Sequence, residues 1–356
     1  MIYYGLAAVS PLFCWAICSW WQKENQLKGA AYEALKKRLT VLAVLPMFLL
    51  FVLRYKYVGV DTIGYVRFFQ NEIRQYSFGQ LLNKDLMRVE IGYRLYVKII
   101  SLFTSNYTVY FFINGCFIFG TLLRFSLKYT KNPFVFFFLF ITLGTYSFFE
   151  TGLRQALAMT TCLWAVDFIR DKKLFKFILT VLIAYYFHKS AMIFLIIYPL
   201  CSIKKYDWMM FVYVILAVVL TIGFTAFQNL FNELLGYEYD VEETGNGGIF
   251  MLFTMVLCAF SFYILYDKKG EDKVLSCMVH LSFLTVIFWI LRLISRSAER
   301  VSYYYMFGLY IYFSQAVNYE KDKLDAFLKW LLVLACLFLF VYRNMGITYR
   351  FFWQGA

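Results

Sequence analysis

The sequence predicts an all-α, polytopic membrane protein with about twelve transmembrane helices and one re-entrant or interfacial helix near residues 93–104. Hydrophobic residues make up 62% of the 356 positions, and the mean hydropathy is +0.62. Only 16% of the residues are charged, compared with about 25% in soluble domains. Apolar runs long enough to cross a hydrocarbon core recur along the whole chain. We therefore expect one transmembrane domain over residues 1–356.

The elements follow from the apolar runs and their polar flanks. The predicted spans lie near residues 2–21, 39–53, 107–123, 133–149, 153–169, 174–187, 190–203, 208–227, 248–266, 274–294, 302–318 and 327–342. The lysine-rich connectors all fall on the cytoplasmic side if both termini face out; they are 22–38, 124–132, 170–176, 204–207, 267–273 and 319–329. No basic segment precedes the first run, so we expect that helix to be retained.

Two outer regions follow from this topology. Residues 54–106 form the longer one, and within it the segment Tyr93–Thr104 is short and carries Arg94 and Lys98. If this segment crossed the membrane, every later loop would lie on the opposite side from the one predicted. We therefore expect it to be the re-entrant or interfacial helix. Residues 228–247 form the second outer loop, which contains acidic residues but neither lysine nor arginine.

The two basic residue types separate by side. The net charge is +13, but the basic residues stand in short clusters between apolar segments, so no nucleic-acid partner is expected. The outer segments hold eleven arginines and only four lysines. A guanidinium binds phosphate or carboxylate in a bidentate way, which favours an anionic ligand on the outer face. The alternative is that these arginines snorkel at helix ends and pair with outer carboxylates.

Several classes of site are not indicated. The eight cysteines all fall inside apolar segments, without a CxxC pair or a His-spaced set, so neither a disulfide framework nor a metal site is expected. The chain has no Walker A, GxGxxG or GxSxG motif, which disfavours ATP-driven transport, dinucleotide chemistry and serine hydrolysis. The energy for a reaction at the outer face would have to come from an activated lipid-linked donor.

The first polar cluster follows the second predicted span. Gly59 and Gly64 permit a tight turn, Asp61 can cap a following helix, and Arg54 lies at headgroup level. The simpler interpretation is a capping turn with an anchored arginine. Farther along, Glu90 stands between Arg88 and Arg94, as part of an ion-pair network or as a poised base.

Two further clusters occupy short outer turns. Arg154 follows Glu150 at a spacing that allows the two to pair, and otherwise it can face a phosphate. His188 lies in the turn between residues 187 and 190, level with the arginines, so a functional role is expected. His280 lies within an apolar run, where a core histidine is expected.

The last cluster is Arg292, Arg296 and Arg300. The i, i+4 spacing places the three on one face of a helix, where like charges repel unless an anion lies among them. This spacing predicts an anionic ligand.

Four short motifs, taken together, resemble a known family. They are R-Y-x-x-V-G-V-D-T-x-x-Y from residue 54, L-R-Q-x-L-A from 153, F-H-x-S-A from 187 and E-R at 299. In that order, over nearly the full length, the chain resembles the EpsG-like branch of the Wzy-type bacterial polysaccharide polymerases, which make O-antigens and exopolysaccharides.

The resemblance implies a multi-pass protein of the bacterial cytoplasmic (inner) membrane with an active site facing the periplasm. Such proteins transfer a growing glycan from undecaprenyl pyrophosphate to the non-reducing end of a second lipid-linked repeat unit. The expected partners are the lipid-linked donor and acceptor and membrane lipid, and the family allows a chain-length regulator (co-polymerase). Neither a cofactor nor a metal is expected.

The resemblance also suggests roles for individual residues. The pyrophosphate would be bound by arginines, namely Arg54, Arg154, Arg292, Arg296 and Arg300. Asp61, Glu90 or His188 would accept the proton of the acceptor hydroxyl, and the motifs do not decide among the three.

Two other functions fit part of the pattern. An O-antigen ligase also uses an undecaprenyl-pyrophosphate donor and outward Arg and His side chains, but usually carries one large periplasmic domain. A flippase or transporter of lipid-linked oligosaccharide also needs a basic cavity, but should place charges along its spans and show repeat symmetry between its halves.

Overall fold

The computed structural model describes residues 1–83, 86–201, 206–223, 247–266, 273–319 and 323–354, with positions 225, 226, 229, 230 and 233. In these ranges the chain forms helices and turns, and its extended pairing is limited to an isolated bridge between Arg54 and Phe351. An all-α architecture is therefore confirmed for the described part of the chain.

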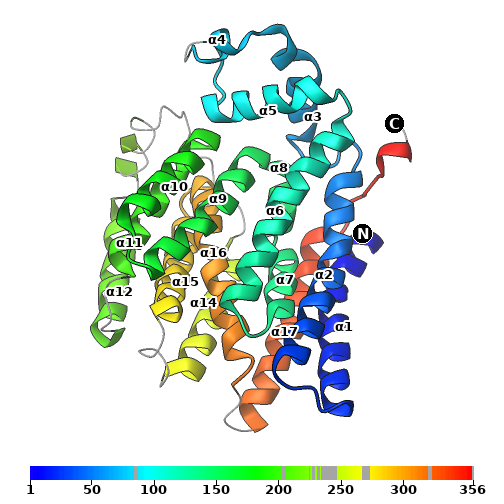
Figure 1. The fold of residues 1–356 in the computed structure, drawn as a ribbon. Helices are drawn as coiled ribbons and strands as arrows, with labels where there is room; N and C mark the ends of the chain where they lie inside the picture. Colours follow the sequence, from blue (N-terminus) through cyan, green and yellow to red (C-terminus); the bar gives the residue numbers. More distant parts are fainter. Residues whose placement is uncertain are drawn as a thin grey trace.

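The helices form a bundle whose long members run side by side (Figure 1). Its α-helices are α1 (Ile2–Glu24), α2 (Gly29–Leu53), α3 (Thr62–Arg67), α4 (Phe78–Leu81), α5 (Ile91–Phe103), α6 (Tyr107–Tyr129), α7 (Pro133–Thr142), α8 (Thr145–Thr151), α9 (Leu153–Arg170), α10 (Leu174–Phe187), α11 (Ile197–Leu200), α12 (Tyr206–Ile222), α14 (Gly248–Leu265), α15 (Lys273–Leu291), α16 (Ser297–Ala316) and α17 (Lys323–Asn344). We call the end that carries α3, α4 and α5 the upper end and the opposite end the lower end.

Membrane crossing is supported by fewer helices than the sequence suggested. Among the described residues, α1, α6, α14 and α17 are long and apolar enough to span a membrane. The bent pair α7 and α8 would make a fifth span, and α10 is among the shorter apolar helices. The chain is thus a multi-pass helical membrane protein, but the count of about twelve spans is not confirmed.

Two predicted spans are not continuous α-helices. Residues 133–149 are divided into α7 and α8, which meet at an angle of 60°. The break falls at Gly144, where φ is +83° and a Cβ would lie 3.0 Å from the Arg343 guanidinium, so only glycine fits without strain. Residues 190–203 begin as a 3-10 helix, Lys189–Ile196, followed by the single turn α11.

The interfacial helix predicted near 93–104 corresponds to α5, which lies across the upper end at a steep angle to α2 and α6 (Figure 1). Arg94 on this helix is 2% exposed. Its guanidinium donates to the carbonyl oxygens of Val89 (2.5 Å), Asn83 (2.7 Å) and Leu81 (3.2 Å). Arg94 therefore holds the preceding loop in place. The other predicted outer loop, 228–247, lies almost entirely outside the described residues.

The cysteines correct one expectation. Cys201 at the end of α11 and Cys277 on α15 form a disulfide, whereas none was expected. The two are 76 residues apart in the sequence, and only the packing of α11 against α15 brings them together. The six other cysteines are free.

Candidate functional site

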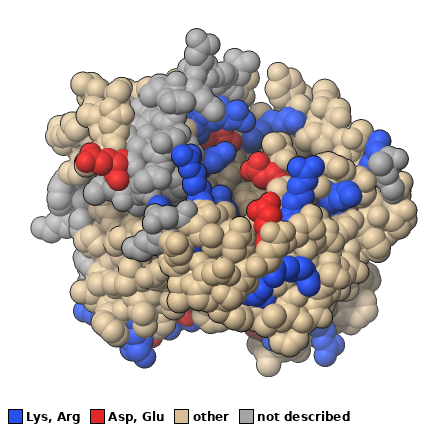
Figure 2. Space-filling model, turned by 90° about the horizontal axis from the view of Figure 1, so that it is seen from above, with Lys and Arg blue, Asp and Glu red and all other residues tan. Residues whose placement is uncertain are grey.

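A cavity of about 320 Å³ lies at the upper end of the bundle. Its wall is assembled from the turn before α3, the α7–α8 and α8–α9 junctions, the turn after α10, the start of α16 and the end of α17. Viewed from above, basic side chains gather around a hollow near the middle of this face, with acidic side chains at its edge (Figure 2).

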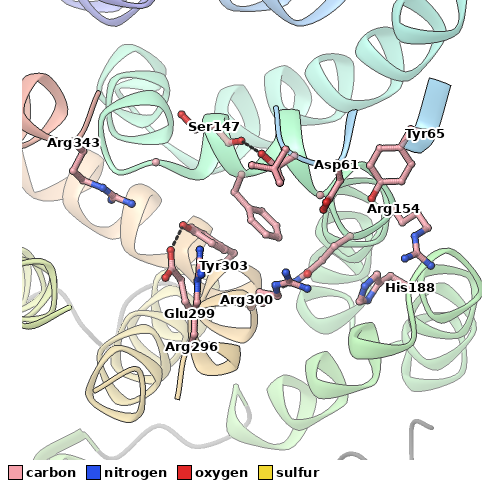
Figure 3. Close-up of a pocket in the computed structure, with 16 residues that line it drawn as sticks. Asp61, Tyr65, Ser147, Arg154, His188, Arg296, Glu299, Arg300, Tyr303 and Arg343 are labelled. Atoms are coloured by element: carbon pink, nitrogen blue, oxygen red, sulfur yellow. Dashed lines mark hydrogen bonds between the residues drawn. The ribbon is translucent and has the colours of Figure 1, made fainter. Parts of the chain in front are cut away.

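Asp61 reaches the cavity from a turn that is docked on α8. The Thr62 hydroxyl donates to the carbonyl oxygen of Glu150 at 3.0 Å. Gly59 has a φ of +93°, and a Cβ there would lie 2.9 Å from the same carbonyl oxygen, so this turn can approach α8 only with glycine. The Asp61 side chain is exposed and points into the cavity (Figure 3). It forms no hydrogen bond or ion pair with any described residue.

Arg154 lines the cavity on the same side as Asp61 and Tyr65 (Figure 3) and is oriented by Glu90. Its Nη1 lies 2.5 Å from Glu90 Oε2, and Glu90 Oε1 accepts from the backbone N–H of Lys189 at 3.3 Å. Glu90 is 7% exposed and lies behind the cavity wall. It thus joins Arg154 to the turn that carries His188. The alternative pairing of Arg154 with Glu150 is not observed.

His188 lines the cavity between Arg154 and Arg300 (Figure 3). Its Nδ1 lies 2.7 Å from Ser190 Oγ, and the backbone N–H of Ser190 points at the same nitrogen at 3.4 Å. Because a backbone N–H can only donate, this arrangement favours the tautomer with its proton on Nε2. Burial, reinforced by Arg154, Arg300 and Lys189, lowers the pKa of His188 to about 4, although Glu90 opposes the shift. The ring is therefore neutral at pH 7.

The three C-terminal arginines do not share a helical face. α15 ends at Leu291 and α16 begins at Ser297, so Arg292 and Arg296 lie at the turn and only Arg300 is inside a helix. Arg296 and Arg300 line the cavity. Arg292 lies in an adjoining pocket, and its Nε donates to Glu299 Oε2 at 2.9 Å. The expected i, i+4 array is wrong because the helix breaks between its first two members.

Glu299 forms the partition between the two pockets. It lines both, and its second oxygen accepts from the Tyr303 hydroxyl at 2.9 Å. The Tyr303 ring stacks on Phe148 at a centroid distance of 4.4 Å. The Gln155 side chain of α9 donates to the Arg300 carbonyl oxygen at 2.6 Å. These contacts fix α16 against α8 and α9.

Arg343 is a cavity residue that the sequence did not single out. It closes α17, lines both pockets and lies beside Gly144. Its guanidinium stands 4.7 Å from the Phe250 ring centroid and forms no ion pair with a described carboxylate. Arg343 directly follows the predicted span 327–342. Arg154 was chosen because it lies at the outer end of a predicted span, and the same criterion could have identified Arg343.

Arg54 is not brought to the cavity. It is fully buried, its Nη1 donates to the Phe51 carbonyl oxygen at 2.7 Å, and its guanidinium lies between the rings of Phe51 (4.2 Å) and Phe111 (4.0 Å). The C-terminal tail covers it, since Phe351 bridges to Arg54 and the Tyr55 N–H donates to Arg350 O at 2.8 Å. This placement indicates a structural role for Arg54.

The arrangement suits an anionic ligand. Arg154, Arg296, Arg300 and Arg343 converge on one cavity from three separate parts of the chain. With Arg292 and Glu90 included, the described residues at the two pockets supply five guanidinium groups and three carboxylates. Guanidinium groups in a partly enclosed site stabilise phosphate charge strongly. Among the described residues, no group of three His, Cys, Asp or Glu side chains is placed to hold a metal ion.

Comparison with known protein families gives a match over most of the chain. A family profile described as "EpsG family" matches residues 37–353. No curated protein and no solved structure matches the chain significantly.

Proposed function

Because the chain belongs to the EpsG family, which is related to the Wzy-like polymerases, we propose that it polymerises polysaccharide repeat units. In this proposal it transfers a growing glycan from undecaprenyl pyrophosphate to the non-reducing end of a lipid-linked repeat unit. The reaction takes place at the outer leaflet of the bacterial cytoplasmic membrane and needs no metal. The observation that carries the proposal is the convergence of Arg154, Arg296, Arg300 and Arg343 on one cavity that also holds Asp61.

The arginines would bind the diphosphate of the donor. In the transfer, the acceptor hydroxyl oxygen forms a bond to the anomeric carbon, and the bond from that carbon to the diphosphate oxygen breaks. The bonding electron pair leaves with the diphosphate, so negative charge grows on the oxygen that had linked its phosphorus to the anomeric carbon. Guanidinium groups already aimed at that position lower the barrier because they need no reorganisation when the charge develops.

Asp61 is the best-placed proton acceptor of the three candidates. Glu90 lies behind the wall with its two oxygens engaged by Arg154 and Lys189. His188 is held by Ser190 in the tautomer that presents a donor at Nε2. The carboxylate of Asp61 is exposed in the cavity and makes no bond to a described residue. Asp61 would accept the hydroxyl proton, and His188 would donate a hydrogen bond to the substrate.

A reconstituted reaction tests the proposal. The full-length protein in proteoliposomes is supplied with one lipid-linked repeat unit, and the products are separated by gel electrophoresis after mild acid release. We expect glycans of two or more repeats and free undecaprenyl diphosphate. Single repeats alone, accompanied by movement of labelled lipid across the bilayer, would show a flippase and exclude the polymerase.

The ligase alternative is separated in cells. In a strain that lacks the gene, a polymerase defect leaves single repeat units attached to the lipid A core, or free single units where no core acceptor exists. Complete loss of attached glycan, with long lipid-linked chains accumulating, would instead indicate a ligase.

A further inference from the structure

Three buried side chains form a hydrogen-bonded chain that ends at the cavity holding Asp61. The Tyr304 hydroxyl lies 2.9 Å from Ser190 Oγ, and Ser190 Oγ lies 2.7 Å from His188 Nδ1. Tyr304 is 1% exposed, and the other two are each 6% exposed. His188 lines the cavity, whereas neither Ser190 nor Tyr304 does. The chain therefore connects the core of the bundle to the cavity wall through the imidazole ring.

The direction of donation along this chain follows from one backbone group. His188 Nδ1 accepts from the Ser190 backbone N–H at 3.4 Å, and a backbone N–H can only donate. With Nδ1 as an acceptor, the Ser190 hydroxyl must donate to it. A hydroxyl has one hydrogen, so Ser190 Oγ in turn accepts from the Tyr304 hydroxyl. Donation thus runs from Tyr304 through Ser190 to His188, and the ring proton is on Nε2.

The opposite direction is disfavoured by the same backbone group. If Nδ1 carried the ring proton, it would donate to Ser190 Oγ, and its hydrogen would face the hydrogen of the Ser190 backbone N–H. The Ser190 hydroxyl would then have to donate to Tyr304, and the Tyr304 hydrogen would need another acceptor in the core. The two hydroxyls and the backbone N–H therefore favour the same tautomer.

The chain is built on elements that also shape the cavity. Tyr304 follows Arg300 by four residues on α16, which is about one helical turn. The same helix thus brings an arginine to the cavity and a hydroxyl to Ser190. The adjacent Tyr305 hydroxyl donates to the Ile193 carbonyl oxygen at 2.8 Å, which anchors the 3-10 helix Lys189–Ile196 to α16. These contacts fix the imidazole relative to Arg300.

A neutral ring with its proton on Nε2 suits this position. Burial lowers the pKa of His188 to about 4, and Arg154 and Arg300 act in the same direction. The ring therefore carries a single proton at pH 7, and its place on the ring matters. An unprotonated Nε2 would repel the oxygens of an anion held by the two arginines, whereas an Nε2–H donates to them.

We propose that Ser190 and Tyr304 are positioning residues that hold His188 in the Nε2–H tautomer for binding the anion in the cavity. They act through the imidazole and do not contact the ligand themselves. The Nε2–H donates to an oxygen of the anion that Arg154 and Arg300 bind. That this anion is the diphosphate leaving group, whose charge grows during the transfer, rests on the proposed function.

Nitrogen NMR spectroscopy tests the tautomer without any substrate. The chain has only two histidines, so the full-length protein in lipid bilayers, labelled with isotopic histidine, gives few ring signals. The signals that disappear in His188→Gln belong to His188. Near neutral pH we expect its Nε2 to be protonated and its Nδ1 to be unprotonated. A protonated Nδ1 in the wild-type protein would overturn the inference.

Three variants test the positioning chain. Tyr304→Phe removes the first donor and Ser190→Ala removes the second. Each should raise the ratio of the Nδ1–H to the Nε2–H tautomer by at least about fivefold, because one hydrogen bond is worth about 1 kcal/mol. Tyr305→Phe is the matched control, since it also removes a buried α16 hydroxyl bound to the 3-10 helix, but one outside the chain. It should leave the ratio within about twofold. An unchanged ratio in both chain variants would contradict the proposal.

The extension reaction adds a readout that lost stability does not move. In proteoliposomes, Tyr304→Phe should lower kcat per folded molecule about fivefold and leave KM within about twofold, because the bond to the leaving group strengthens as charge develops. Tyr305→Phe should keep both values within about twofold of wild type.

The two readouts together separate this inference from the proposed function. A shifted tautomer with unchanged kcat would show that the transfer does not use the Nε2–H, and would overturn the inference. If the tautomer shifts as expected but the wild-type protein extends no glycan, the positioning of His188 stands and the polymerase proposal fails.

Discussion

Two groups of basic side chains lie at opposite ends of the bundle and are organised differently. At the lower end, Asp167 of α9 is the shared partner of Arg124 and Lys128 of α6, and it also accepts from the Tyr129 hydroxyl. The Arg124 guanidinium stacks 3.9 Å above the Trp164 ring. At the upper end, Arg154, Arg296, Arg300 and Arg343 surround a cavity. The lower cations are bound to one shared carboxylate, whereas the upper ones line a cavity.

This difference separates an ion-pair cluster from a binding site. The lower group joins two helices, since one carboxylate between two cations ties α6 to α9. At the upper end, Glu90 orients Arg154, and Glu299 binds Arg292 of the adjoining pocket, so neither carboxylate closes the cavity. Loss of an upper arginine should therefore remove function, and loss of a lower one should cost only some stability.

The largest effect is expected at Asp61. Asp61→Asn keeps the size and polarity of the side chain but cannot accept a proton, so chain extension should fall by at least about 100-fold. The rate of glycan extension in proteoliposomes measures the effect, and pyrophosphate affinity should stay within about twofold. Extension at the wild-type rate would remove Asp61 from the mechanism and leave the cavity as a binding site alone.

The next effect concerns the upper arginines. Arg300→Lys keeps the charge but loses the bidentate geometry, and we expect extension to fall by roughly 100-fold. Arg296→Lys should act in the same direction. Arg67→Lys, at an exposed position outside the cavity, serves as the matched control. Equal activity of all three variants would show that the transfer does not need bidentate contacts from Arg296 or Arg300.

A smaller effect is expected from pH. The folded-state pKa of His188, about 4, lies below its ordinary value of 6.5. The resulting stability is present above pH 6.5 and is lost as the pH falls towards 4, by roughly 3 kcal/mol at the end of that range. Thermal unfolding of the purified protein measures this loss. In His188→Gln the thermal stability should depend less on pH between 6.5 and 4. An unchanged pH dependence would show that other groups cause the loss of stability in acid.

The smallest effect is expected at the lower end. Arg124→Gln leaves Asp167 with Lys128 and Tyr129, so the cost in stability should be on the order of 1 kcal/mol. Chain extension should remain within about threefold of wild type. A loss as large as that of Arg300→Lys would mean that the lower cluster takes part in the reaction, and the contrast between the two ends would fail.

Much of the fold was accessible from the sequence because hydrophobicity is a local property. The apolar runs located most long helices to within a few residues; the span expected at 107–123 is contained in α6, and that at 153–169 in α9. The sequence also placed Asp61, Arg154, His188, Arg296 and Arg300 in outer turns, and the structure brings all five to one cavity. Residues in the turns between apolar runs lie at one end of the bundle or the other. The sequence therefore predicts which end they occupy without any knowledge of how the helices pack.

The tertiary structure alone decided which side chains meet. It buried Arg54 between two rings, paired Arg154 with Glu90 rather than Glu150, and brought Arg343 to Gly144 across some two hundred residues of chain. It also joined Cys201 to Cys277 and divided the Arg292–Arg300 array at a turn. These outcomes depend on how helices pack laterally, which the hydrophobic period does not specify. The sequence determined the residues available at the upper end, and helix packing decided which of them form the site.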